Sequence, residues 1–241
     1  MIKFFRKIRQ NLLSEGKTEK YLKYAIGEII LVVIGILIAL QINNWNEKRK
    51  ERNKEDQLID VLITDLQSKK AEFTSDLAIG KSIIRNSDVS INYWKKSSDI
   101  DTLNLKYLLK YLAEDEWFFN ENSPVYATIA GSELWKQLPD SLNRQIDNMY
   151  RIQFGLIKSA FAKQSEYALN GKLNFLAPNH LLNLNESTLN LQRIVAENDE
   201  DFIVFLELFK SGVIRLTSKF ETTIPSIDRL IENLEFYKND K

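Results

Sequence analysis

Two hydrophobic patterns follow one another along this chain, and the first is a continuous apolar run. Every residue from Ile29 to Leu40 is apolar, Glu28 stands just before the run, and Gln41 with three nearby asparagines ends it. A helix over residues 24–45, rising about 1.5 Å per residue, extends roughly 31 Å, which matches the ~30 Å hydrocarbon core of a bilayer. The pattern therefore predicts a transmembrane anchor at residues 24–45.

The second pattern is amphipathic and follows a highly charged stretch. Apolar residues recur there at steps of three, four and seven residues, with charged residues between them, and this spacing predicts a helix. No proline precedes Pro124 and only Gly80 weakens the segment, so the helix is predicted to continue from the anchor without a break. The apolar positions of this helix are Ile59, Leu62, Leu66, Phe73, Leu77, Ile84, Ile91 and Trp94.

Three further helical segments are expected after this long helix. A short amphipathic helix follows a break at residues 97–102, a longer helix covers residues 141–170, and a third covers residues 202–237, where Pro225 predicts a kink or a restart. The stretch at residues 170–187 is rich in turn-forming residues and predicts no firm element.

Because strand signals are nearly absent, we predict an all-α protein. A single N-terminal transmembrane helix is expected to continue into a long stalk helix, packed with two other long helices as an antiparallel bundle with short helices at the far end. The predicted parts are a basic cytoplasmic head (residues 1–23), the anchor (24–45) and an extracytoplasmic helical domain (46–241).

Two other interpretations of the apolar run fit the sequence less well. A buried helix of a soluble protein can contain such a run, but here aromatic residues stand at both expected membrane interfaces, Tyr21 and Tyr24 on one side and Trp45 on the other. A cleaved signal peptide has a short basic head and a small-residue cleavage site, whereas about 25 residues precede this run and no such site follows it. We expect an uncleaved anchor.

The basic residues predict the orientation of the anchor. Seven Lys or Arg residues precede it, and five follow at residues 48–54, so the positive-inside rule places the N-terminus in the cytoplasm. We expect a single-pass protein of the bacterial inner membrane with its C-terminal domain in the periplasm, and membrane lipid is accordingly an expected partner.

Two segments resemble a known family. The segment "YAIGEIILVVIGILIALQINNWNE" (residues 24–47) closely resembles the N-terminal signature of a family of single-pass bacterial membrane proteins, mostly of Bacteroidetes type, whose function is unknown. The segment "NSPVYATIAGSELWKQLPDSLNRQIDNMY" (residues 122–150) is similar to the middle part of that family, although Asn143-Arg144 replaces an expected Leu-Arg step. The resemblance implies an envelope location and no particular activity.

Composition excludes several kinds of chemistry. The 241 residues include no cysteine and one histidine, His180, which removes thiol catalysis and disulfides and argues against a histidine-rich metal site or a Ser/His triad. The 33 basic and 33 acidic residues cancel, so the overall charge does not indicate a nucleic-acid partner. No cofactor is expected. His180 follows a proline and an asparagine and is predicted to be a turn or capping residue.

Four residues form a candidate packing face on the anchor: Glu28, Gly35, Ala39 and Asn46. At 100° per residue these positions fall within about 40° of one another. Small residues let helices approach closely, and a carboxyl group in lipid seeks a partner, so this face can pack against another protein or a second copy. The alternative is that Glu28 reaches back to the headgroups and Gly35 is incidental.

A group of aromatic residues surrounds the predicted distal helices: Trp94, Trp117, Phe118, Phe119 and Trp135. They are interpreted as core residues or as a partner-binding face. Two acidic clusters, at residues 113–117 and 198–201, lack the spacing and the turn glycine of an EF-hand. These clusters are interpreted as charge at helix ends.

Three functions from different classes are consistent with these observations. We favour a non-enzymatic envelope protein whose helical domain mediates assembly with a protein partner or a second copy, because no catalytic arrangement is recognisable. The second is a sensor-like ligand-binding module, and the third is a hydrolase that uses carboxylates. An open apolar face near Trp117 would favour the first, and an enclosed pocket between helices would favour the second.

Overall fold

The computed structural model describes residues 18–96, 119, 123–180, 182 and 199–240. All regular structure among these residues is helical, and they contain no strand, which confirms the all-α prediction. Contacts divide the chain into two compact units, residues 1–57 and 58–241. Helix α2 (Thr18–Lys96) contains the apolar run and, as predicted, continues without a break through the amphipathic segment. The short helix predicted after residue 102 lies outside the described residues.

Helix α9 (Asp199–Asn239) shows how the second unit is built. Its buried residues alternate between steps of four and three, which is the spacing of core positions in a coiled coil. A strict seven-residue repeat of this kind keeps one face of a helix against its neighbours along its whole length. The buried positions of this repeat are Phe202, Leu206, Phe209, Val213, Leu216, Phe220, Thr223, Ile227, Leu230 and Leu234, and Gly212, Thr217 and Ile231 beside the repeat are also buried.

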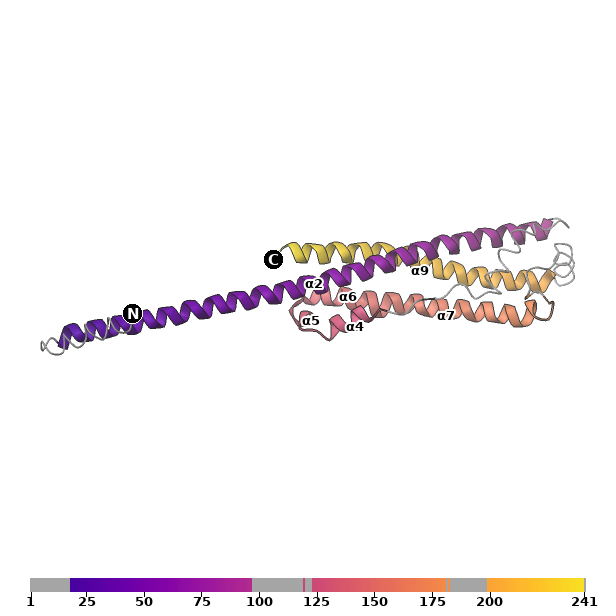
Figure 1. Ribbon diagram of the computed structural model, residues 1–241. Helices are drawn as coiled ribbons and strands as arrows, with labels where there is room; N and C mark the ends of the chain where they lie inside the picture. The colour runs from indigo at the N-terminus through magenta and orange to yellow at the C-terminus, as the bar shows by residue number, and fades with distance from the viewer. Residues whose placement is uncertain (1–17, 97–118, 120–122, 181, 183–198, 241) are drawn as a thin grey trace. The chain divides into compact units, whose positions relative to one another are not determined.

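Three long helices pack in the second unit: the part of α2 after Leu58, α7 (Phe154–Gly171) and α9, and Figure 1 shows them side by side. Helix α9 runs antiparallel to α2, because residues late in α9 pair with residues early in this part of α2. The ion pairs that fix this order are Lys238–Asp60 at 2.6 Å, Lys70–Asp228 at 2.5 Å and Lys210–Asp88 at 2.8 Å. The predicted bundle of three long helices is therefore present.

The apolar face predicted for α2 is correct in its first half and again at Ile91, but it differs from the structure at Ile84. Ile83 is fully buried, whereas Ile84 is only partly buried. The reason is that the seven-residue repeat continues through Gly80, Ser87 and Ser90, which are buried although they are small or polar. Four positions are fully buried as predicted: Ile59, Leu62, Leu66 and Phe73.

The helix predicted over residues 141–170 contains a π-helical turn. Helix α6 (Asp140–Asp147) leads into the π turn η1 (Asn148–Gln153), which leads into α7. The buried positions step by five residues from Met149 to Phe154, one more than the repeat allows, and a π turn accommodates one extra residue of this kind. This turn carries Tyr150.

Two predictions about the later part of the chain need correction. The stretch that follows α7 is not without structure, because a second π turn, η2 (Lys172–Leu176), extends the helix and buries Phe175 and Leu176. His180 ends the following turn with φ 60 and donates its backbone N–H to Ala177 O, as predicted for a turn residue. Of the two alternatives predicted at Pro225, a kink or a restart, the restart is wrong: α9 continues through Pro225, which is exposed.

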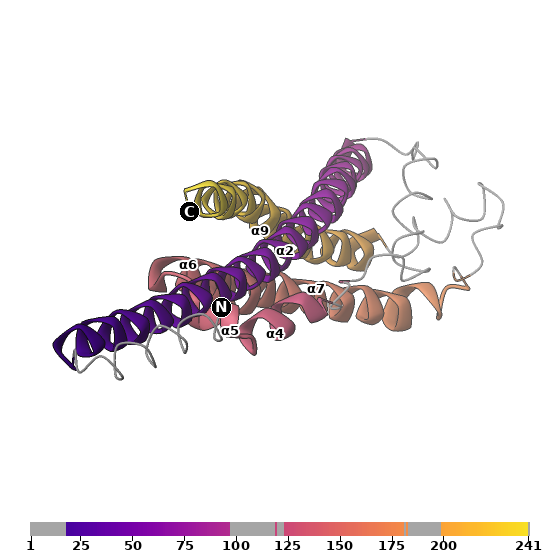
Figure 2. The same cartoon turned by 60° about the vertical axis from the view of Figure 1, so that its left-hand side comes forward.

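The short helices α4 (Pro124–Ala130) and α5 (Glu133–Gln137) lie at the Leu58 end of the second unit rather than at the predicted far end. In both views they lie beside α6 (Figure 1 and Figure 2). Ser123, which precedes α4, bonds to Asp65 near the start of this part of α2. The physical reason is that α7 runs in the same direction as α2, so α6 and the short helices just before it lie where α7 begins, at the Leu58 end.

Candidate functional site

A pocket of about 190 Å³ opens between α2, α4 and the start of α7, and it is the candidate site. We call it the Lys69 pocket. It is partly open to solvent. Its lining residues come from segments far apart in the sequence: Lys69, Phe119, Ser123, Tyr126, Tyr150, Phe154, Gly155 and Lys158.

Lys69 occupies a core position of α2. It falls between Leu66 and Phe73 in the seven-residue repeat, and its side chain is only 6% exposed. The Lys69 Nζ donates to Glu72 Oε2 at 2.9 Å and lies 5.5 Å from the centroid of the Phe119 ring. A buried ammonium requires such partners, because removing it from water costs several kcal/mol.

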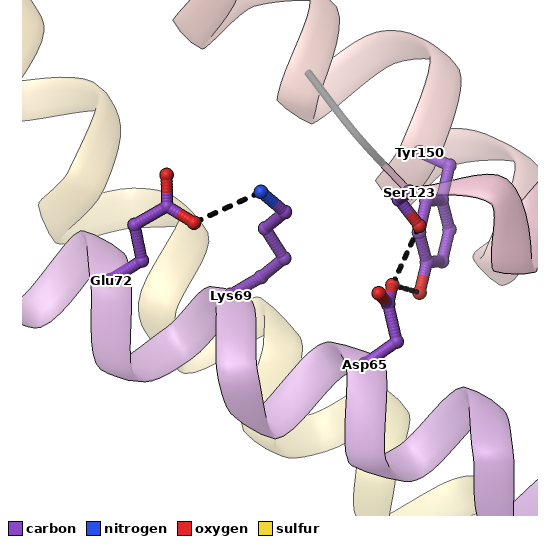
Figure 3. A network of polar contacts seen from close by, with 5 residues as sticks. All are labelled: Asp65, Lys69, Glu72, Ser123 and Tyr150. Carbon is purple, nitrogen blue, oxygen red and sulfur yellow. Dashed lines mark hydrogen bonds and ion pairs between the residues drawn. The ribbon is translucent and has the colours of Figure 1, made fainter. Parts of the chain in front are cut away.

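Asp65 joins three segments of the chain at the edge of the pocket. Its Oδ2 accepts a hydrogen bond from Ser123 Oγ at 2.8 Å and another from Tyr150 Oη at 2.6 Å, as Figure 3 shows. The π turn supplies Tyr150, and α2 supplies both Asp65 and Lys69. Burial, followed by the hydrogen bond to Asp65, raises the pKa of Tyr150 far above its ordinary value.

Tyr126 on α4 makes a second contact of the same kind. Its hydroxyl donates to Asp147 Oδ1 at 2.6 Å, and Arg151 Nη1 lies 3.3 Å from the same oxygen. Burial and then this hydrogen bond raise the pKa of Tyr126 to about 12. The same bond lowers the pKa of Asp147, because it stabilises the charged carboxylate. Both tyrosines therefore stay protonated at neutral pH.

Aromatic rings form much of the pocket wall. The Tyr126 and Tyr150 rings stack with centroids 5.1 Å apart and an interplanar angle of 11°. Phe154 packs edge-on against Tyr150 at 5.1 Å, and Phe119 stacks on Phe73 at 6.2 Å. A Cβ added at Gly155 would meet no atom within 4 Å, so the glycine leaves that part of the wall open.

The lining combines positive charge with flat apolar surfaces. Its two charged residues are Lys69 and Lys158. The neighbouring carboxylates of Asp65 and Glu72 are not lining residues, and they hold the lining hydroxyls and Lys69 in place. Among the described residues no group of three or more His, Asp or Glu is arranged to hold a metal ion.

A family comparison decides where the chain belongs. The model of a family described as a family of unknown function, DUF6090, matches residues 28–211. The chain belongs to this family. The matched range includes the apolar run of α2 and every lining residue of the Lys69 pocket. No curated protein and no solved structure matches the chain.

In this DUF6090 protein the predicted anchor face lies on one continuous helix. Glu28, Gly35, Ala39 and Asn46 all belong to α2, and a Cβ added at Gly35 would meet no atom within 4 Å. Asn46 Oδ1 accepts a hydrogen bond from Arg49 at 3.3 Å. What packs against this face stays a prediction.

The predicted interface residues also lie on α2. Trp45 is 64% exposed, and the Arg49 guanidinium lies 5.3 Å from its ring centroid. Tyr21 and Tyr24 are within the helix. Their membrane role stays a prediction.

The five distal aromatic residues do not form one described surface. Phe119 and Trp135 pack against the hydrophobic core, which agrees with the core interpretation of these two residues. Trp94 belongs to α2, and Trp117 and Phe118 lie outside the described residues.

Sequence reasoning missed the Lys69 pocket altogether. Asp65, Lys69, Ser123 and Tyr150 are ordinary surface types in the sequence, and only the fold brings them together. Two signals were available: a lysine at a core position of the repeat, and the five-residue step from Met149 to Phe154 that marks the π turn.

Proposed function

We propose that this protein is a single-pass, membrane-anchored envelope protein without enzymatic activity, whose helical unit mediates assembly with a protein partner or a second copy. One observation carries the anchoring. Helix α2 contains a segment apolar and long enough to cross a membrane, and none of that segment is buried. The core helix of a soluble protein would instead bury such a surface.

The proposed orientation places the N-terminus in the cytoplasm and residues 46–241 in the periplasm, as the basic residues predict. Because the chain has no cysteine, a single introduced cysteine shows on which side of the membrane its own position lies. We expect a membrane-impermeant maleimide to label Ser218→Cys, at an exposed position of α9, in cells with a permeabilised outer membrane. Ser14→Cys should be labelled only after lysis. The reverse pattern, or recovery of the chain in the soluble fraction, would refute the proposal.

The proposed assembly uses the face of Glu28, Gly35, Ala39 and Asn46. Crosslinking and pull-down from native membranes should capture a defined protein partner or a homo-oligomer. The double variant Glu28→Leu, Gly35→Leu should lose it, because leucines remove both the carboxyl group and the close approach. The control Ile30→Leu, Leu37→Ile has the same spacing on the opposite side of the helix and should retain it. Equal capture by both variants would contradict assembly through this face.

A second candidate function is a sensor-like ligand-binding module. The observation that favours it is the Lys69 pocket between helices of the second unit. Pockets of this type, largely apolar with a few placed polar groups, are the usual sites of small molecules between helices. Ligand binding and assembly are compatible, because the pocket and the anchor face lie in different units of the chain.

A further inference from the structure

We propose that the Lys69 pocket binds a small organic anion with a flat apolar body, of the chemical class of aromatic carboxylates. The inference rests on the second proposed function and assigns it a ligand chemistry. Its parts are the buried ammonium of Lys69, the stacked tyrosine rings, and the opening at Gly155.

The position of Lys69 is costly for the fold. At the neighbouring core positions, Leu66 and Phe73 are fully buried, and an apolar residue at position 69 would avoid the cost of removing an ammonium from water. Glu72, whose side chain is 29% exposed, supplies a carboxylate to this ammonium, but even a paired buried charge is costly relative to an apolar residue. A second irregularity, the π turn, lies at the same level of the bundle, and such turns are frequent at functional sites. Two costly features at one place indicate a role beyond packing.

The two lysines of the lining favour an anion. The hydroxyl protons of Ser123 and Tyr150 are donated to Asp65, and that of Tyr126 is donated to Asp147. These three hydroxyls therefore present lone pairs and no proton to a ligand, so they do not attract an anion themselves. The positive charge of the lining comes from the two lysines, Lys69 and Lys158. An anionic group can approach these ammonium groups and gain a charge-assisted hydrogen bond.

The aromatic groups favour a flat apolar body. Tyr126 and Tyr150 stack nearly parallel, and the Phe154 ring stands against Tyr150 at 69°. Rings in these orientations accept a further ring by stacking or edge contact. The volume of about 190 Å³ limits the ligand to a single small ring with its substituent. The missing side chain at Gly155 keeps the pocket open on the side of α7.

The test uses the full chain in phosphatidylcholine nanodiscs and three probes measured by isothermal titration calorimetry. Benzoate carries the charge and the ring, benzamide has the same shape without the charge, and acetate has the charge without the ring. We expect saturable binding of benzoate. Benzamide should bind at least about tenfold more weakly because it lacks the charge, and acetate should bind at least about tenfold more weakly because it lacks the ring.

Two pairs of variants separate the pocket from the rest of the surface. Lys69→Met keeps the apolar stem and should weaken benzoate about tenfold, whereas Lys163→Met removes a lysine of α7 outside the lining and should not. Gly155→Leu should fill the pocket from an open position and abolish binding, whereas Gly155→Ala should keep it. Thermal melting of each variant confirms that it is folded.

The outcomes distinguish two kinds of failure. Equal affinities for benzoate and benzamide would overturn the anion inference and leave ligand binding in place. An unchanged benzoate affinity in folded Gly155→Leu would show that the Lys69 pocket is not the site. No binding of any probe at millimolar concentration would overturn the aromatic-anion inference together with the support that the pocket gives to a ligand-binding function, while the proposals on anchoring and assembly would stand.

Discussion

Gln164 places a side-chain amide in the core without a hydrogen-bond partner among the described residues. It occupies a core position of α7, and both polar atoms of its side-chain amide are buried without a hydrogen-bond partner among the described residues. A Cβ added at Gly212 of α9 would collide with Gln164 Oε1. The amide therefore packs directly against the backbone of α9, and Gly212 provides the space.

We predict that Gln164→Met raises the free energy of unfolding by about 1–3 kcal/mol, because methionine fills a similar volume without an unsatisfied amide. Chemical denaturation measures the change. Thr217→Val is the control, since the buried Thr217 hydroxyl already bonds to Ile214 O, and it should gain much less. A loss of stability in Gln164→Met would contradict this prediction.

Tyr126 should make the protein sensitive to alkali. Its pKa is raised from 10.0 to about 12 in the folded chain, so unfolded chains lose this proton at a lower pH than folded chains do. Stability from this group is complete below pH 10 and is lost as the pH rises toward about 12. Tyr126→Phe should therefore show a shallower fall of the denaturation midpoint over this range. An identical fall in both proteins would contradict the shifted pKa.

At the scale of elements, the π turn is the feature with the clearest consequence. Deleting Ile152, which is exposed within η1, leaves four-residue spacing between Met149 and Phe154, so the repeat no longer requires the extra residue. We expect a folded chain that loses the bond from Tyr150 to Asp65 and about 1–3 kcal/mol of stability. Circular dichroism checks that the chain is folded, and chemical denaturation measures the loss of stability.

The control for this deletion removes a residue from regular α-helix. Deleting the exposed Lys163 of α7 rotates every later core position by about 100° and should disrupt packing from Gln164 onward. If removal of Ile152 disrupts the fold to the same extent, the π turn is required for packing, and its position beside the Lys69 pocket has no functional meaning.

Individual helices also show how much of the fold could be predicted from the sequence. The spacing of apolar residues is sufficient to predict the long amphipathic helix. At Ile59, Leu62 and Leu66 the residues predicted to face the core are buried. Apolar spacing gives a wrong prediction where polar or small residues occupy core positions. It therefore predicts that Ile84 is buried, whereas the repeat buries Ile83. The Lys69 pocket could not be predicted from the sequence for the same reason, because an analysis of hydrophobic periodicity assigns a lysine to the surface.

At the scale of the whole molecule, the second unit has a core composed of its own residues. Phe73 of α2 contacts the rings of Phe119, Phe154 and Phe220, which come from three different parts of the chain. The ion pairs between α2 and α9 also lie within residues 58–241. Among the described residues every member of this hydrophobic core lies after residue 57, which predicts a unit that folds without residues 1–57.

We therefore predict that residues 58–241 alone form a soluble helical protein that unfolds cooperatively, whereas the full chain requires detergent or lipid. Circular dichroism during chemical denaturation checks the first expectation, because a single sigmoidal transition indicates a packed core. Residues 74–241, which lack Phe73 and the core residues before it, are the matched control and should not fold. If residues 58–241 aggregate or unfold gradually, the first unit contributes to the core, and the anchor is then part of the fold as well as a tether.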